Sequence, residues 1–160
     1  DSDLPFAVPD VDDAVSIVSG DLHTCAVRSD GSVWCWGRIG DLVGDDRMFT
    51  VDAPTQIPGL HDVQELAGST NKCALLASGE VQCLGYSMLS EVLGADPYWT
   101  TATVQGLDGV EQLGATWAHA CALVEGGTVQ CWGTGEGGVL GNGSDEESAT
   151  PVTVIAGIAP

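Results

Sequence analysis

Six cysteines are the residues of this chain best suited to chemistry, and their spacing is regular. The two members of each pair lie ten positions apart, and successive pairs are offset by 48 positions. The pairs are Cys25 and Cys35, Cys73 and Cys83, and Cys121 and Cys131. Paired cysteines can bind zinc, carry redox chemistry or form disulfides. Structural zinc usually takes ligands two to four residues apart, and the chain has no Cys-Xaa-Xaa-Cys motif, so the spacing favours disulfides.

The residues between the paired cysteines predict a β-hairpin rather than a helix. In the first pair, Asp30-Gly31 is a turn signal with apolar residues on both sides. If Cys25 faces Cys35, the turn has three residues, and the last one takes a left-handed conformation that glycine adopts without strain. Glycine occupies that place in all three pairs. Opposed cysteines on antiparallel strands lie within reach of a disulfide, so we predict one disulfide in each hairpin.

The surroundings of the cysteines repeat with them, which divides the chain into three units. Alanine follows the first cysteine of each pair, valine precedes the second by two positions, and glycine follows it by two. The approximate units are 8–58, 59–105 and 106–158, within a single repeat domain of residues 1–160. Both faces of each hairpin are apolar. A repeat of about 40–50 residues with two buried faces predicts an all-β fold of four-stranded antiparallel propeller blades, here three of them.

These units resemble regulator-of-chromosome-condensation repeats. The similarity rests on "SGDLHTCAVRSDGSVWCWG", "AGSTNKCALLASGEVQCLG" and "TWAHACALVEGGTVQCWG", each followed by "LVG" or "VLG". The resemblance implies β-propeller blades, and the paired cysteines make the chain similar to the family's secreted bacterial branch. Three positions depart from the family pattern: Asn71 replaces its histidine, Leu84 its tryptophan and Thr116 its glycine.

The number of units raises the question of how the propeller closes. Propellers typically have four to eight blades, the family usually has seven, and this chain has three units. An incomplete propeller exposes apolar blade faces, which soluble monomers avoid. We therefore expect either a fragment or a homo-oligomer. Two copies would make six blades about a two-fold axis, and open stacking would make a filament.

Charge and motifs exclude several classes of function. The chain has 23 Asp and Glu residues against 4 Lys and Arg, a net charge of −19, which disfavours nucleic-acid partners and anionic membrane surfaces. It has no run of about 18 apolar residues, so we expect no membrane insertion. His23 and His119 occupy a structural position of the repeat, and His61 has no evident partner. No nucleophile elbow, phosphate loop or dinucleotide fingerprint is present. We predict neither catalysis nor a cofactor.

The acidic segment "GNGSDEES", residues 141–148, is the stronger of two candidates for metal binding, the weaker being "GDD" at 44–46. Asn142, Asp145 and Glu146 carry oxygen ligands of the kind that Ca²⁺ prefers. The segment lacks the regular alternation of ligands found in a dedicated calcium loop. A solvated acidic loop is therefore the favoured interpretation, and no metal is predicted.

The segments that link the repeated parts diverge, as binding loops on a rigid scaffold do. Large apolar, aromatic and arginine side chains dominate interface hot spots. The candidate partner-binding residues are Arg38, Arg47, Met48, Phe49, Tyr86, Tyr98 and Trp99. The alternative is that these side chains fill contacts between blades.

These observations predict a non-catalytic module that binds a protein partner or a second copy of itself. Three disulfides would place it in an oxidising compartment, as a secreted, periplasmic or cell-surface protein. The alternative is a structural subunit of a cell-surface assembly or filament, built by stacking the blade ends. An enzyme using a central channel is less favoured. GTPase exchange, which the family also performs, is disfavoured because its partners are not in an oxidising compartment.

Overall fold

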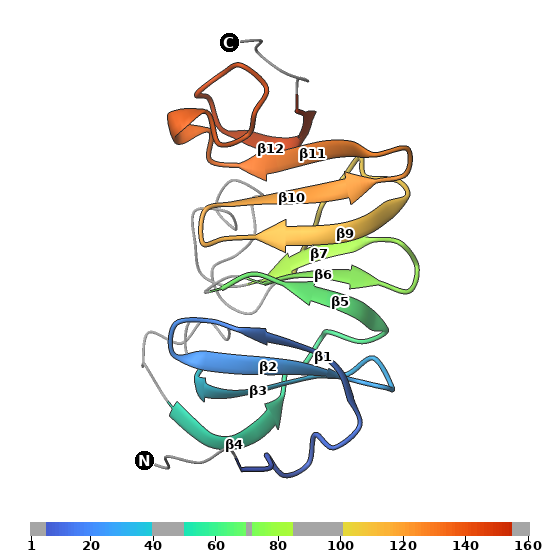
Figure 1. The fold of residues 1–160 in the computed structure, drawn as a ribbon, viewed down its shortest axis with the longest axis vertical. Coiled ribbons are helices and arrows are strands. Elements are labelled where there is room, and N and C mark those ends of the chain that lie inside the picture. The colour runs from blue at the N-terminus through green and yellow to red at the C-terminus, as the bar shows by residue number, and fades with distance from the viewer. Residues whose placement is uncertain (1–5, 40–49, 70–71, 85–100, 155–160) are drawn as a thin grey trace.

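The computed structural model describes residues 6–39, 50–69, 72–84 and 101–154. These residues form twelve strands in three antiparallel sheets of four (Figure 1). Blade 1 contains β1 (Ala14–Ser19), β2 (His23–Arg28), β3 (Val33–Arg38) and β4 (Thr50–Gln56). Blade 2 contains β5 (Val63–Ala67), β6 (Lys72–Leu76), β7 (Val81–Leu84) and β8 (Ala102–Thr103). Blade 3 contains β9 (Val110–Ala115), β10 (His119–Val124), β11 (Thr128–Gly133) and β12 (Ser148–Thr153).

The prediction of an all-β fold with three four-stranded antiparallel blades is confirmed. Strands follow one another in sequence order within each blade, and the blades are stacked along the molecule (Figure 1). The one helical element among the described residues is a short 3-10 turn, η2 (Glu136–Gly138). None of the helical structure in the described ranges is long and apolar enough to cross a membrane.

The three predicted disulfides are present, and each lies across a hairpin. Cys25 is directly opposite Cys35, and the other two pairs have the same register. In blade 1 the Arg28 N–H donates to the Ser32 carbonyl and the Gly31 N–H donates to the Arg28 carbonyl. These bonds close the three-residue turn, and Gly31 has φ +77°. Gly79 and Gly127 have φ of +87° and +79° at the same place, so the left-handed requirement explains the repeated glycine.

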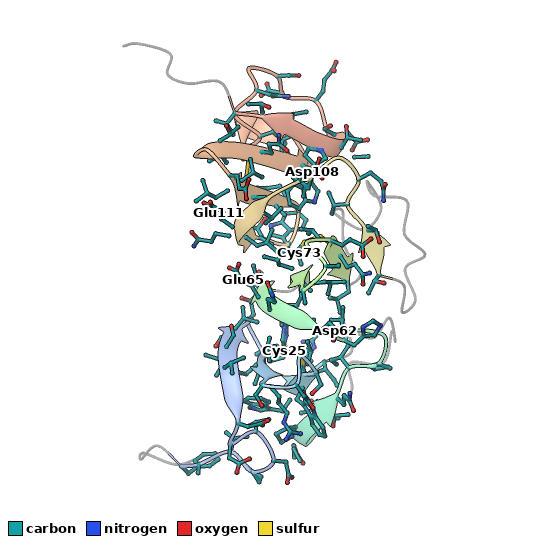
Figure 2. The ribbon with its side chains drawn as sticks, turned by 90° about the vertical axis from the view of Figure 1, so that its right-hand side faces the viewer. Cys25, Asp62, Glu65, Cys73, Asp108 and Glu111 are labelled. Carbon is teal, nitrogen blue, oxygen red and sulfur yellow. A yellow bond between two sulfur atoms is a disulfide. The ribbon has the colours of Figure 1, made fainter. Side chains whose placement is uncertain are left out.

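Each blade has two faces, and the side chains on them alternate along the strands. We call the side that carries the cysteines the disulfide face and the other side the opposite face. The disulfide face of blade 1 shares a buried core with the opposite face of blade 2. The disulfide face of blade 2 does the same with the opposite face of blade 3. Figure 2 shows Cys25 and Cys73 within these layers of side chains.

The first strand of each blade contains a β-bulge, and its position sets which side chains enter the core. The bulges place Ile17, Leu66 and Leu113 opposite the alanines that follow the first cysteines. A constant 48-residue offset would instead place Glu65 in that row. The register of β5 is shifted by one residue, because the apolar Leu66 is the side chain that can be buried against blade 1. Leu66 is 5% exposed.

The carboxylate of Glu65 consequently lies beside the next blade. It accepts the backbone N–H of Leu113 on β9, with N–O distances of 3.3 and 3.4 Å. Figure 2 shows Glu65 and Glu111 at the same edge of the molecule, where the first strands of blades 2 and 3 run. Glu65 therefore links the two blades through a side chain that the residue spacing alone would have assigned to the core.

Candidate functional site

The turns between the first two strands of blades 1 and 3, and the connection between β11 and β12, lie at one end of the blades, opposite the hairpin turns (Figure 1). At this end, the Arg38 N–H donates to the Leu22 carbonyl at 2.8 Å. In blade 3, the Thr134 N–H donates to the Ala118 carbonyl at 2.9 Å. Each bond joins the end of a third strand to the connection between the first two strands of its blade. We define the loop face as residues 20–22, 38–39, 68–69, 116–118 and 134–147.

Two histidines hold the turns of this face, in agreement with their structural interpretation. In blade 1 the Gly20 N–H donates to the His23 carbonyl at 2.8 Å, and the His23 ring lies where a side chain at Gly20 would extend. In blade 3 Thr116 takes the place of the glycine. Its hydroxyl lies 3.1 Å from His119 Nδ1 and accepts the His119 N–H at 3.2 Å. Thr116 thus replaces the family glycine with a hydrogen-bonded turn.

Blade 2 holds the corresponding turn with a lysine. Lys72 is 1% exposed. Its ammonium donates to the carbonyl of Gly68 at 2.6 Å and to that of Ser69. Burial lowers the pKa of Lys72 to about 8, and the negative charge of Asp21 in blade 1 partly opposes this shift. One feature of the sequence indicates that Lys72 is unusual: the matching positions of the other two units hold the small residues Thr24 and Ala120.

The loop face exposes large apolar side chains. Leu22 is 61% exposed, Trp117 57% and Val139 41%. They come from blade 1 and from two connections of blade 3, and each lies on the loop face. Blade 2 lies between Leu22 and the two residues of blade 3, so these side chains are separate exposed contact points along one face.

Arg38 is the predicted binding residue that the structure describes, and it lies on the loop face. Its side chain is partly buried. Its Nε atom is buried and has no hydrogen-bond partner in the described part of the chain. The other predicted residues lie outside the described residues: Arg47, Met48, Phe49, Tyr86, Tyr98 and Trp99. Their role stays a prediction.

Leu22 and Trp117 are surface residues that sequence reasoning missed. Both precede the first cysteine of their unit by three or four positions, inside a stretch that was interpreted as structural repeat. The available signal was the presence of a large apolar residue in a turn whose counterparts in the other units are Ser69, Thr70, Asp21 and Ala118.

The acidic segment of blade 3 folds as a series of turns. The Ser144 N–H donates to Asn142 Oδ1 at 3.1 Å, and the Glu146 N–H donates to the Ser144 hydroxyl at 3.0 Å. Asp145 and Glu146 are exposed. Within the described ranges, no three His, Cys, Asp or Glu side chains are placed to hold a metal ion. The structure therefore does not bring the weak calcium candidates together with further acidic ligands.

The remaining histidine is at the surface of the connection between blades 1 and 2. His61 Nδ1 lies 3.1 Å from Asp62 Oδ2, and both side chains are largely exposed. A histidine and a carboxylate in open solvent form a weak pair. This arrangement supplies no catalytic constellation.

One family model matches the first part of the chain. Residues 14–38 match the model described as the regulator of chromosome condensation (RCC1) repeat. This segment is β1, β2 and β3 of blade 1, including the first disulfide hairpin. The chain is thus similar to RCC1 repeat proteins, and the three blades extend that similarity beyond the matched residues.

Known proteins agree with this relationship. The ultraviolet-B receptor UVR8 of Arabidopsis thaliana is 28% identical over 149 residues, which cover 86% of this chain and 33% of the receptor. The chain therefore spans about a third of that relative. The crystal structure of Prp20p from Saccharomyces cerevisiae superposes with a TM-score of 0.71 and 17% identity, over 89% of this chain and 38% of Prp20p.

A third similar protein is extracellular in its own setting. The ectodomain of the receptor kinase CR4 from Physcomitrella patens matches with a TM-score of 0.52 and 21% identity. The match covers 75% of this chain and 29% of the ectodomain. Both structural matches concern the fold, and they establish that these three blades are arranged as in RCC1-like propellers.

Proposed function

We propose that this chain is a non-catalytic, extracellular module that binds a protein partner through its loop face. The observation that carries the proposal is the exposure of Leu22, Trp117 and Val139 at the same end of the blades. Arg38 lies beside Leu22 there, joined to it by a backbone hydrogen bond. Tryptophan and arginine are the residues that most often dominate binding energy at protein interfaces.

The scaffold suits a binding surface because the strands are held independently of the loops. Every blade has a disulfide across its central hairpin, so the ends of the strands that carry the loop face are fixed. A rigid surface loses less conformational entropy on binding. Protein binding also occurs within this fold, since the work on Prp20p concerns its binding to Gsp1p and histones.

The net charge of −19 indicates the kind of partner. An acidic surface attracts a basic protein over long distances and raises the rate of association. The same field repels the phosphates of nucleic acids. The proposed partner is therefore a protein with a basic surface, and the proposal includes no nucleic acid, cofactor or membrane insertion.

The proposed location rests on the disulfides. Three disulfides and no free cysteine among the described residues suit an oxidising compartment. The receptor-kinase ectodomain shows that a related fold is used outside the cell. The disulfides support a secreted, periplasmic or cell-surface location, which is part of the proposal together with the relationship to the secreted bacterial branch.

The test compares a loop-face variant with a matched control. A surface protein that the wild-type chain captures would be identified, purified and titrated against the variants by calorimetry. Leu22→Ala with Trp117→Ala should weaken its binding about 30-fold or more, as the loss of an interface hot spot does. Ile17→Ala, which removes an equally exposed side chain outside the loop face, should leave affinity unchanged. Equal binding by the double variant and the wild type would overturn the proposal.

A second candidate function is supported by the two ends of the stack. A homo-oligomer, or a structural subunit that assembles by blade-end stacking, would cover apolar side chains that this chain leaves exposed, among them Ile17 at 67% and Val129 at 37%. This function does not involve the loop face. The two functions are therefore separable by substitutions on different surfaces, the loop face and the outer faces of blades 1 and 3.

A further inference from the structure

The molecule has two closed junctions between blades, and they differ at the end of the strands that carries the hairpin turns (Figure 1). The first junction lies between blades 1 and 2, and the second lies between blades 2 and 3. We define the turn face as the hairpin turns 29–32, 77–80 and 125–127 together with the connections 57–62 and 104–109. The turn face lies at the opposite end of the strands from the loop face, so it is a separate surface.

At the first junction, the hairpin turn of blade 1 lies directly on the start of blade 2. The Val63 N–H donates to the Gly31 carbonyl at 3.0 Å. A Cβ atom at Gly31 would lie 2.8 Å from the Cα atom of Asp62, so the two segments leave no space between them. Leu60 and Val63 are consequently buried, at 3% and 4% exposed.

At the second junction, the equivalent hairpin turn stands away from the segment that follows it. Gly79 takes the place of Gly31, and in the described part of the chain a Cβ atom there would meet nothing within 4 Å. Leu107 and Val110 take the places of Leu60 and Val63. Both are only partly buried. The same two segments that touch at the first junction therefore enclose a space at the second.

This space is a cavity of about 390 Å³ between the hairpin turn 78–80 and the connection 103–109. Figure 2 views the turn face and shows Asp108 on the connection between blades 2 and 3. The volume is at the lower end of the range for pockets that hold small ligands, about 300–1,000 Å³. Gly79 and Gly106, which line the cavity, have open space where a side chain would extend. The cavity therefore has room for a group from outside.

The lining of the cavity combines two carboxylates with an apolar side chain. Glu80 and Asp108 both line it, and both are exposed. At the first junction their places hold Ser32 and His61, so the carboxylates occur at the junction that has the cavity. Leu107 supplies apolar lining. Among the described residues that line the cavity there is no lysine or arginine, so the lining does not supply a basic group of its own.

A long basic side chain is complementary to this lining. Its methylene stem can lie on an apolar surface while its charged end stays at a polar rim. Carboxylates accept two N–H bonds from a guanidinium at once, and they bind an ammonium as a point charge. A metal ion suits the cavity less well, because in the described ranges no three His, Cys, Asp or Glu side chains are placed to hold one.

The source of such a side chain is a second protein rather than a second copy of this chain. The chain has 4 basic residues against 23 acidic ones. Two of the basic side chains are already engaged, since Arg28 pairs with Asp13 and Lys72 donates to backbone carbonyls. Two copies with a net charge of −19 each repel one another, whereas a basic protein is attracted.

We propose that the cavity at the second junction binds an arginine or lysine side chain of a basic partner protein. The carboxylates of Glu80 and Asp108 hold the charged end, and Leu107 contacts the stem. The proposal goes beyond binding at the loop face, because the cavity lies at the other end of the strands and can be occupied whether or not the loop face binds.

A peptide with one basic side chain tests the site. The oxidised, isotope-labelled chain would be titrated by NMR with the end-blocked peptide Gly-Arg-Gly. The backbone N–H signals of Gly79, Gly106 and Gly109 should shift together and saturate with one Kd. The peptide with citrulline in place of arginine has nearly the same shape and no charge. It should bind about fivefold or more weakly, as expected for the loss of a partly exposed ion pair.

Two substitutions locate the charge that matters. Glu80→Gln and Asp108→Asn each remove one negative charge and keep the shape of the side chain. Each should weaken binding of the arginine peptide about threefold, and both together about tenfold. Asp52→Asn is the matched control, because Asp52 is exposed on β4 of blade 1 and the substitution removes the same charge. It should leave the affinity unchanged, and circular dichroism confirms that the variants are folded.

Several outcomes would overturn the proposal. Equal affinity for the arginine and citrulline peptides would mean that the carboxylates do not bind the charged end. Shifts that spread over the whole surface without saturating, or an equal loss in Asp52→Asn and Glu80→Gln, would mean that net charge alone attracts the peptide. Because none of these measurements involves Leu22 or Trp117, failure here would leave binding at the loop face intact, and failure of the loop face would leave this site standing.

Discussion

The closed junctions and the open ends of this molecule use the same strands, the same hairpin and the same disulfide, yet they leave equivalent side chains in different environments. Trp132 is fully buried between blades 2 and 3. Trp36 occupies the same place in blade 1 and is partly exposed. The repeated sequence therefore determines how each blade folds. The packing of an adjacent blade determines how much a given side chain stabilises the fold.

The largest expected effect is at the closed junction. Trp132→Ala should lower the free energy of unfolding by about 3–5 kcal/mol, because it leaves a cavity in a packed core. Trp36→Ala should cost clearly less in the monomer, since part of its side chain is already in water. Urea unfolding of the two variants and the wild type would measure both losses. Equal losses of unfolding free energy in the two variants would contradict this prediction. They would mean that the neighbouring blade contributes little to the stabilisation by Trp132.

A milder substitution sharpens the same contrast. The Nε1–H of Trp132 is buried and has no hydrogen-bond partner in the described residues. Trp132→Phe removes this unsatisfied donor while keeping most of the apolar ring, so its cost should be far below that of alanine. A loss as large as that of alanine would show that the shape of the indole, and not its burial alone, is required at the junction.

The disulfides should differ in their accessibility to reductant. Both sulfurs of the second pair are covered, with Cys73 at 0% and Cys83 at 2% exposed. Cys121 belongs to the open face and is partly exposed. Under limiting reductant, Cys121–Cys131 should therefore open severalfold faster than Cys73–Cys83, because thiol–disulfide exchange requires access to a sulfur. Differential alkylation with mass spectrometry would follow each pair.

The covered second pair is the internal control for this prediction, because its rate reports the intrinsic resistance of a buried disulfide in the same molecule. Equal rates for the two pairs at low concentration would show that the open face is not open to small reductants.

Much of this architecture could be predicted from sequence because the constraint that sets it is local. The position of Gly31 after Asp30, and the ten-residue cysteine spacing, define a three-residue hairpin turn whatever surrounds it. The two apolar faces then require neighbours on both sides. Long-range consequences were harder to predict, such as the one-residue shift of β5 that buries Leu66 instead of Glu65. That choice depends on which side chain blade 1 can accept.

The proposed binding surface was harder to predict from the sequence than the register of β5. Leu22 and Trp117 are separated by 95 positions, and only the folded blades bring both to the loop face. Spacing within one repeat carries no information on that. Arg38 could be chosen because it follows a recognisable Trp-Gly, whereas Leu22 lies within a turn whose histidine drew the structural interpretation. In this turn the exposed Leu22 directly precedes His23, whose carbonyl bonds the turn.

The smallest expected effect concerns the polar end of the first junction, where the loops of blades 1 and 2 meet. Lys72 is buried there, near Asp21, and its counterpart at the second junction is Ala120. Its pKa falls from 10.5 to about 8 in the folded chain. Between these two values the unfolded chain binds more protons than the folded one, so the free energy of unfolding should rise with pH in this window.

Lys72→Met should remove that rise. The wild type should gain stability relative to the variant as pH increases from about 8 towards 10.5, and show no such gain below pH 8, where the lysine is charged in both states. Urea midpoints across this range would measure it, and Thr24→Met, at the equivalent place in blade 1, is the matched control. An unchanged pH slope in Lys72→Met would mean that the ammonium is better solvated than its burial suggests. The two closed junctions would then contribute to the pH dependence of stability more equally than the difference between Lys72 and Ala120 suggests.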